Sequence, residues 1–132
     1  MLRTKSVQSA ISRKEDGIRI LVTRFRGRGL APSRYDAWMA NLGPSEALLR
    51  RFQRSGDTAQ SWRAFAKGYE QEIFAPARFD GSNPTIKNHG QKFTLRLLKA
   101  LSRRQNVTIL CHCAEDQAHC HRHLLEKLIE RA

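Results

Sequence analysis

The chain has 132 residues, of which 24 are Lys or Arg and 12 are Asp or Glu, so its formal net charge is +12. This length suits one compact domain over residues 1–132, and a hydrophobic content of 40% is too high for a disordered chain. No apolar run approaches the roughly 20 residues that span a bilayer, and the first residues lack the apolar stretch of a signal peptide. We therefore expect a cytoplasmic protein with no membrane partner, whose three cysteines are thiols or metal ligands.

The first half of the chain is predicted to contain two strands followed by two helices. Residues 3–7 form a short strand, and residues 18–25, rich in β-branched and apolar side chains, form a buried one. A helix is expected over 32–42, because a proline opens it and Gly-Pro follows it. Ser45 is a suitable N-cap for a short helix over 46–52.

The second half is predicted to be mostly helical around one central strand. Residues 60–74 carry aromatic and aliphatic side chains at helical spacing, and residues 76–90 form a loop. Residues 92–104 form the next helix, residues 107–113 a central strand, and residues 117–131 the last helix. Helices separated by a few apolar strands indicate an α/β fold, namely a single small domain with a short, largely parallel sheet flanked by helices.

All three cysteines and four of the five histidines lie between positions 111 and 123. One interpretation is a zinc site, because thiolate and imidazole are ligands that zinc prefers, although the cysteine spacing matches no known zinc knuckle. His119 and His123 are four residues apart and would share one helix face. If a metal is present, the candidate ligands are Cys111, Cys113, Cys120, His119 and His123.

A second interpretation of the cluster is catalysis. The carboxyl end of a strand that leads into a helix is where open α/β sheets bind ligands, and the helix N-terminus lowers the pKa of a nearby thiol. Cys113 or Cys111 is then a possible nucleophile, and Arg122 a possible phosphate or carboxylate ligand. The third interpretation is structural, since a buried cysteine packs as a small apolar residue and the histidines can lie on the surface.

A basic glycine-rich loop follows the strand predicted at 18–25. Its backbone amides can form an anion nest around Gly29, with Arg24 and Arg28 adding bidentate contacts. A solvated basic loop is the alternative interpretation. The segment has neither the Gly-Lys-Ser/Thr of a Walker loop nor a dinucleotide fingerprint.

These motifs in this order resemble the bacterial domain-of-unknown-function 488 family, in particular its YeaO-like branch. The resemblance is carried by the residues at 21–30, Trp38, 42–45 and 62–69, and by the Cys-His-Arg signature within 110–122. It implies a compact cytoplasmic α/β domain without an established activity. It covers most of the chain, and it bears on the fold more than on the activity.

The resemblance also implies which residues form the family's site, and where this chain departs from it. The usual first motif is Asp-Arg-Leu-Trp-Pro-Arg-Gly, and here Thr23 replaces the Asp, so an acid–base role at that position is not carried over. Arg26 and Gly27 replace the Trp and Pro, whereas Arg24, Arg28 and Gly29 match. The positions carried over are Arg24, Arg28, Cys120, His121 and Arg122.

Three hypotheses of different classes follow, and they leave open whether the chain is an enzyme. The first is a cleft that binds a phosphate-bearing small molecule or nucleotide through Arg24, Arg28 and Arg122. There the reactive thiol is Cys113 or Cys120 and the proton carrier is His121. The second is a nucleic-acid-binding module without catalysis, suggested by seventeen arginines and the +12 charge. A zinc-binding structural or regulatory protein is third. Charge gathered into one stripe favours nucleic acid, and charge lining a cleft favours a small anion.

Overall fold

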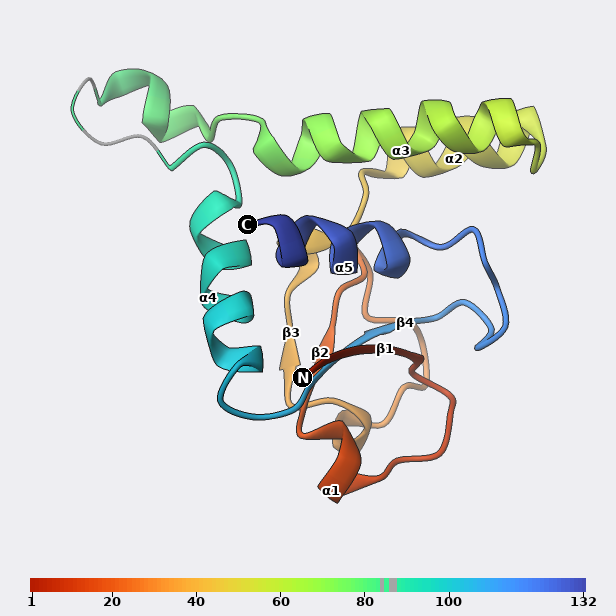
Figure 1. The fold of residues 1–132 in the computed structure, drawn as a ribbon. Coiled ribbons are helices and arrows are strands. Elements are labelled where there is room, and N and C mark those ends of the chain that lie inside the picture. The colour runs from red at the N-terminus through yellow and green to blue at the C-terminus, as the bar shows by residue number, and fades with distance from the viewer. Residues whose placement is uncertain (84, 86–87) are drawn as a thin grey trace.

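The computed structural model describes residues 1–83, 85 and 88–132, which form an α/β domain around a parallel sheet (Figure 1). In the described residues the sheet has four strands in the order β1-β4-β2-β3, and every pair is parallel. The strands are β1 (Leu2–Ser6), β2 (Ile18–Leu21), β3 (Ala37–Trp38) and β4 (Val107–Cys111). The predicted class and the short parallel sheet are confirmed, and β4 is the inner strand between β1 and β2.

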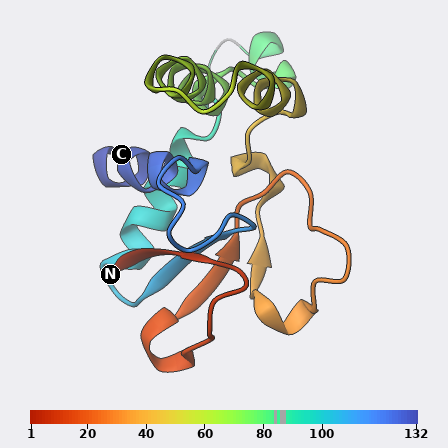
Figure 2. The same ribbon diagram turned by 90° about the vertical axis from the view of Figure 1, so that its right-hand side faces the viewer.

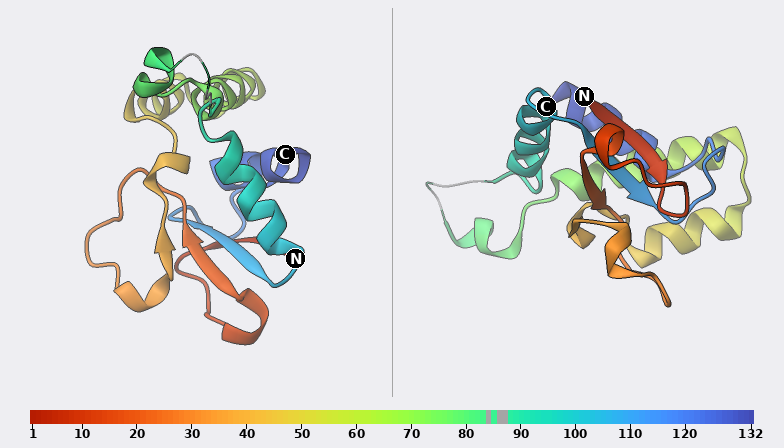
Figure 3. Two further views of the ribbon diagram at one scale, coloured as in Figure 1. Left: turned by 90° about the vertical axis from the view of Figure 1, so that its left-hand side faces the viewer. Right: turned by 90° about the horizontal axis from the view of Figure 1, so that it is seen from below.

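Helices are stacked on one face of this sheet. The α-helices of the described residues are α1 (Arg13–Asp16), α2 (Glu46–Ser55), α3 (Ala59–Phe74), α4 (Lys92–Ser102) and α5 (His121–Arg131). Short 3₁₀ segments are η1 (Pro32–Arg34), η2 (Ala40–Leu42) and η3 (Arg78–Ser82). Figures 2 and 3 show α5 between the sheet and the paired helices α2 and α3. No helix in the described part of the chain is long and apolar enough to cross a bilayer.

The alternation of side chains along β2 and β4 divides the core into a large and a small cluster. Ile20 and Ile109 point to the face covered by α4 and α5 and belong to the large cluster. Leu21 and Leu110 point to the opposite face and pack in the small cluster under the loop after β2. Each such fully buried aliphatic side chain stabilises the fold by about 1.5–3 kcal/mol.

Four predicted elements lie where the sequence places them. The first strand matches β1, and the helices predicted at 46–52, 60–74 and 92–104 match α2, α3 and α4. The Ser45 side chain accepts a hydrogen bond from the Leu48 amide, which confirms its N-cap role. The predicted loop at 76–90 contains η3, and its positions 84, 86 and 87 lie outside the described residues.

The helix predicted over 32–42 is wrong. The segment forms η1, then β3, then η2, because its backbone pairs with β2 instead of with itself. The Asp36 carboxylate accepts a hydrogen bond from the Arg19 amide at 2.8 Å, and the Met39 amide donates to Leu21 O at 2.8 Å. The Trp38 indole donates to Thr23 O at 2.7 Å, so its ring spans to the loop after β2.

The ends of β2 and β4 and the start of α5 also differ from prediction. Strand β2 ends at Leu21 and not at Phe25, and β4 ends at Cys111 and not at Cys113. Helix α5 begins at His121 and not at Gln117. The stretch 112–120 is therefore a loop, which frees its backbone carbonyls to accept hydrogen bonds from side chains.

A buried ionic network stabilises the amino-terminal end of the sheet, opposite the end at which β2 and β4 lead into loops. The Arg19 side chain is fully buried and its guanidinium pairs with the buried Asp16 carboxylate. Lys5 Nζ lies 3.0 Å from Asp16 Oδ1, and the Ser12 amide donates to Asp16 Oδ2 at 3.1 Å. Burial raises the pKa of Asp16, but hydrogen bonds from Ser12, Lys5 and Arg19 outweigh it, so the net pKa is lowered.

We predict that Asp16→Asn lowers the free energy of unfolding by about 3–5 kcal/mol near pH 7, because it leaves the Arg19 charge buried without a partner. Urea unfolding measures this, with Asp116→Asn as the exposed control. Because the folded-state pKa is lowered, the contribution of Asp16 is complete above the unfolded value of 3.8 and declines as the pH falls below it. The difference in free energy of unfolding between wild type and Asp16→Asn must therefore become smaller in acid. A difference that grows in acid would contradict the lowered pKa of Asp16.

Candidate functional site

A small pocket lies where the neighbouring strands β2 and β4 end. Its volume is about 180 Å³, and its walls come from segments 23–25 and 111–113, from α2, and from His121 at the start of α5. These segments are far apart in sequence but meet because parallel strands deliver their carboxyl ends to one edge of the sheet. The pocket thus lies at the edge where α/β sheets bind ligands.

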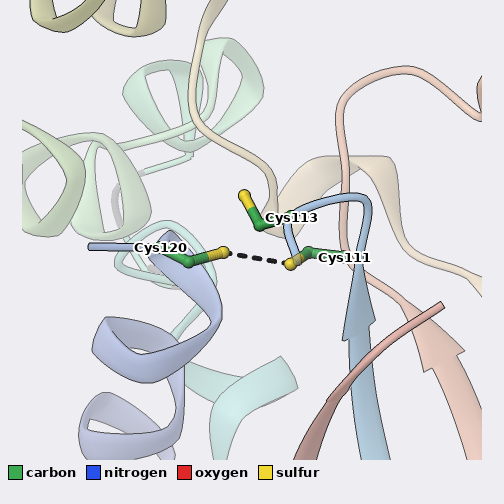
Figure 4. A group of neighbouring side chains, drawn as sticks. All are labelled: Cys111, Cys113 and Cys120. Carbon is green, nitrogen blue, oxygen red and sulfur yellow. Dashed lines mark hydrogen bonds between the residues drawn. The ribbon is translucent and has the colours of Figure 1, made fainter. Parts of the chain in front are cut away.

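Three thiols converge beside this pocket (Figure 4). Cys111 ends β4, Cys113 lies in the following loop, and Cys120 occupies the N-cap position of α5. Their sulfur atoms all lie within 4.8 Å of one another, and Cys111 Sγ is 3.0 Å from Cys120 Sγ. Cys111 and Cys120 are buried, whereas Cys113 is half-buried and lines the pocket. Cys111 and Cys113 lie close together although β4 ends at Cys111.

The Arg122 guanidinium is fully buried behind the thiols. Its Nη1 donates to Cys111 Sγ at 2.7 Å, and its Nη2 donates to the backbone oxygens of Ala114 and Glu115 at 3.0 and 2.9 Å. A buried cation needs a negative partner, and the sulfur cluster is the nearest buried one. The structure therefore places Arg122 inward, against the thiols and their loop, and not on the wall of the pocket, where it was expected to bind a substrate anion.

The three thiols titrate as one coupled group because each lies within reach of the others. Hydrogen bonds from Cys111 and Cys120, together with the charge of Arg122, lower the pKa of Cys113. The same thiol hydrogen bonds, and burial, raise the pKa values of Cys111 and Cys120. The coupling therefore favours the thiolate form at Cys113 over the other two thiols, with the positive charge of Arg122 beside the group.

His121 presents one unprotonated ring nitrogen toward the thiols. Its Nε2 donates to Val22 O at 2.6 Å, which leaves Nδ1 as the lone-pair nitrogen, 4.0 Å from Cys120 Sγ. Burial lowers the pKa of His121, so the ring is neutral near pH 7. The Tyr69 ring packs edge-on against it at 5.8 Å and fixes its orientation. Nδ1 can accept a proton or coordinate a metal.

His119 and His123 do not join the thiols, which corrects the predicted five-residue ligand set. His119 stacks on Trp62 with ring centroids 4.6 Å apart and pairs with Asp57, and His123 Nε2 lies 3.1 Å from Gln117 O. Their shared helix face is lost because α5 begins only at His121. Among the described residues, the group that can hold a metal consists of the three cysteines.

Only part of the basic glycine-rich loop reaches the pocket. Arg24 lines it while donating to the backbone oxygens of Gly43 at 2.8 Å and Pro44 at 3.4 Å. Gly43 allows this close approach, since a Cβ there would lie 2.4 Å from the Arg24 amide nitrogen. Arg28 and Gly29 are exposed and do not line the pocket. The predicted anion site is thus divided, with Arg24 alone of the three beside the thiols.

Glu115 is a site residue that the sequence analysis missed. Its carboxylate accepts hydrogen bonds from the Ser6 amide at 3.1 Å and the Ser9 hydroxyl at 2.8 Å, and lies 3.7 Å from Arg122 Nη2. It therefore ties the cysteine loop to the end of β1. A single glutamate in a polar loop carries no local signal of this role, because its partners lie about a hundred residues away in the sequence.

Comparison with known proteins yields one finding. The sequence model described as the active DUF488-N3 subclade matches residues 2–132, which include every strand, every helix and all three cysteines. No curated protein matches the chain, and no solved structure matches it either.

We predict that Arg122→Leu destabilises the fold by about 3–5 kcal/mol, because it removes a buried charge from its thiol and carbonyl partners. Arg28→Leu removes the same charge from an exposed position and should change the free energy of unfolding by less than about 0.5 kcal/mol. Urea unfolding of both variants measures the difference. Equal effects would show that Arg122 does not hold the cysteine loop.

Proposed function

The chain belongs to the DUF488 family, and from that premise we propose that it is an enzyme whose nucleophile is the Cys113 thiolate. One observation carries the proposal: of the two thiols that line the pocket, Cys111 and Cys113, Cys113 is the one that is only half-buried, and the buried arginine contacts the other. The description of the matching subclade as active is in keeping with an enzyme.

The surroundings of Cys113 favour the thiolate, which is the reactive form of cysteine. The thiols of Cys111 and Cys120 can donate to it, and Arg122 supplies a positive charge that water cannot screen well in a buried position. The resulting nucleophile is available near neutral pH, where an ordinary cysteine is mostly protonated.

The pocket favours a small substrate with an anionic group. Its volume of about 180 Å³ is below the 300–1,000 Å³ usual for ligand pockets, so it admits a small molecule or the reactive end of a larger one. Phe25 and Leu49 give it apolar walls, and Arg24 is the cation that can bind a phosphate or carboxylate. Glu46 also lines the pocket, so we expect the anionic group to lie on the Arg24 side.

A balanced group transfer follows from this arrangement. Attack forms a bond between Cys113 Sγ and the electrophilic atom while the bond to the leaving group breaks, and the leaving group departs with the electron pair. Water then hydrolyses the covalent intermediate and returns the thiolate. His121 Nδ1 takes the proton from that water and releases it to solvent, where the departed leaving group gains a proton, so the net reaction is hydrolysis.

The convergence of three sulfur atoms favours a second candidate, a zinc centre. Cysteine thiolates are preferred zinc ligands, and the sulfur atoms of Cys111, Cys113 and Cys120 lie within 4.8 Å of one another. Three thiolates, one divalent zinc and the Arg122 cation sum to no net charge, which suits a buried site. The chain's own residues would then supply ligands, with His121 Nδ1 as the nearest imidazole nitrogen, and no free thiolate nucleophile would remain.

We predict that iodoacetamide alkylates Cys113 at least about tenfold faster than Cys111 or Cys120 at about pH 6, because it combines thiolate character with access. Mass spectrometry of tryptic peptides measures the three rates. Turnover of a panel of small nitrophenyl phosphate and carboxylate esters should be lost in Cys113→Ser and kept in Arg28→Gln. Alkylation of the three cysteines at equal rates, or alkylation of Cys113 only above about pH 8, would contradict the assignment of Cys113 as the nucleophile.

Metal content separates the two candidates. For protein purified without tag or chelator, the thiol enzyme predicts three titratable thiols per folded chain and no stoichiometric metal by elemental analysis. One equivalent of zinc, lost on replacing any of Cys111, Cys113 and Cys120 by Ser, would reassign the thiols as ligands. Cys113→Ser alone retaining full zinc would exclude that reassignment.

A further inference from the structure

Basic side chains form a continuous row along α4. Residues 81–114 contain no Asp or Glu, although they include six Lys or Arg. Four of these six stand at offsets 0, 4, 7 and 11, which places them on one side of a helix. We call this row the basic stripe, and its members are Lys92, Arg96, Lys99 and Arg103.

The stripe borders two open hollows that meet at α4. One has a volume of about 400 Å³ and the other about 280 Å³, and both are lined by Arg96 and Ala132. No Asp or Glu of the described residues lines either hollow. Lys99 Nζ donates to the backbone oxygen of Ala132 at 2.8 Å. Arg131 also lines the larger hollow, and its Nη2 lies 3.1 Å from Glu70 Oε1. The remaining stripe residues have no acidic partner among the described residues.

The length of the stripe suits several consecutive phosphates. At 1.5 Å per residue its four charges extend over about 16 Å. Within a B-form duplex one strand carries a phosphate about every 3.4 Å of rise, and a free single strand is more extended, so the stripe covers at most about five nucleotides. This is close to the lower end of the 4–16 nucleotides that one OB fold covers.

Exposed apolar side chains lie directly beside the stripe on the same helix. Phe93 is 50% exposed and Leu97 is 62% exposed, and they are one turn apart. The Arg96 guanidinium lies 5.7 Å from the centroid of the Phe93 ring, which joins the aromatic face to the row of charges. Cations that follow a backbone beside an aromatic ring that can stack on a base are the usual elements of single-strand binding.

We infer that α4 is a docking surface for single-stranded nucleic acid, whose phosphates follow the basic stripe and one of whose bases stacks on Phe93. Helix α4 packs beside the C-terminal end of α5, whereas the thiols lie at its N-terminal end (Figure 1). The inference is therefore independent of the proposed thiol chemistry. It answers the question of charge distribution, because these cations gather along one helix and not around the pocket.

Fluorescence anisotropy with a labelled oligonucleotide of about twelve nucleotides tests the inference on the full chain across a salt series. The triple variant K92Q/R96Q/R103Q should bind single-stranded DNA and RNA at least about tenfold more weakly, with a log K against log salt slope smaller by about two. The control R51Q/R54Q/R63Q removes three exposed arginines of α2 and α3, so the net charge falls equally, and its affinity should stay within about threefold. Circular dichroism confirms that both variants remain folded.

Several outcomes would overturn the inference. Equal weakening in the control means that net charge, and not the stripe, attracts the nucleic acid. Duplex bound as tightly as single strand, or unchanged affinity in Phe93→Ala, removes the stacking role. Binding to phosphatidylserine vesicles without binding to oligonucleotide points to a membrane surface instead. Cys113→Ser should bind nucleic acid as wild type does, so failure of the thiol proposal leaves this result unaffected.

Discussion

The buried Arg122 guanidinium is the interaction on which the site depends. Its Nη1 donates to Cys111 Sγ at the end of β4 and its Nη2 to the carbonyls of Ala114 and Glu115, so one charge holds that loop beside the three thiols. Its burial is possible because the Cys111 sulfur and these carbonyls accept the hydrogen bonds that water would otherwise accept. Glu115 extends the same arrangement to β1. Reactivity and local stability therefore share a cause, and a change that loosens the loop should also weaken the thiolate.

Much of the fold could be predicted because its signals are local. Helix α3 follows from apolar spacing, α2 from the Ser45 cap, and β4 from its β-branched residues. Strand β3 could not be predicted, because a two-residue strand is defined by its pairing with β2 and not by its own sequence. The predicted helix over 32–42 failed for that reason.

The location of the candidate site could be predicted from the sequence, but which side chains meet there could not. The crowding of Cys and His within 111–123 indicated the right loop, and the three cysteines do converge. Which side chains face inward depends on where α5 begins, and this single boundary turns His119 toward Trp62 and Arg122 toward the thiols. The walls contributed by α2 and by the loop after β2 come from tertiary packing, for which no spacing rule exists.

Positive charge has two separate uses in this molecule. One arginine is buried and acts on sulfur over a short distance in a medium that screens little, so its effect persists at high salt. The charges along α4 are exposed or half-buried, and in our proposal they act on a polyanion through solvent, so their effect should fall steeply with salt. The ultraviolet thiolate absorbance of metal-free protein, measured as a function of pH, tests the first of these uses most directly. We predict one thiolate per chain already present near pH 7 and two thiols that ionise only above the ordinary cysteine pKa of about 8.5. Three thiols that ionise together near that ordinary value would contradict it.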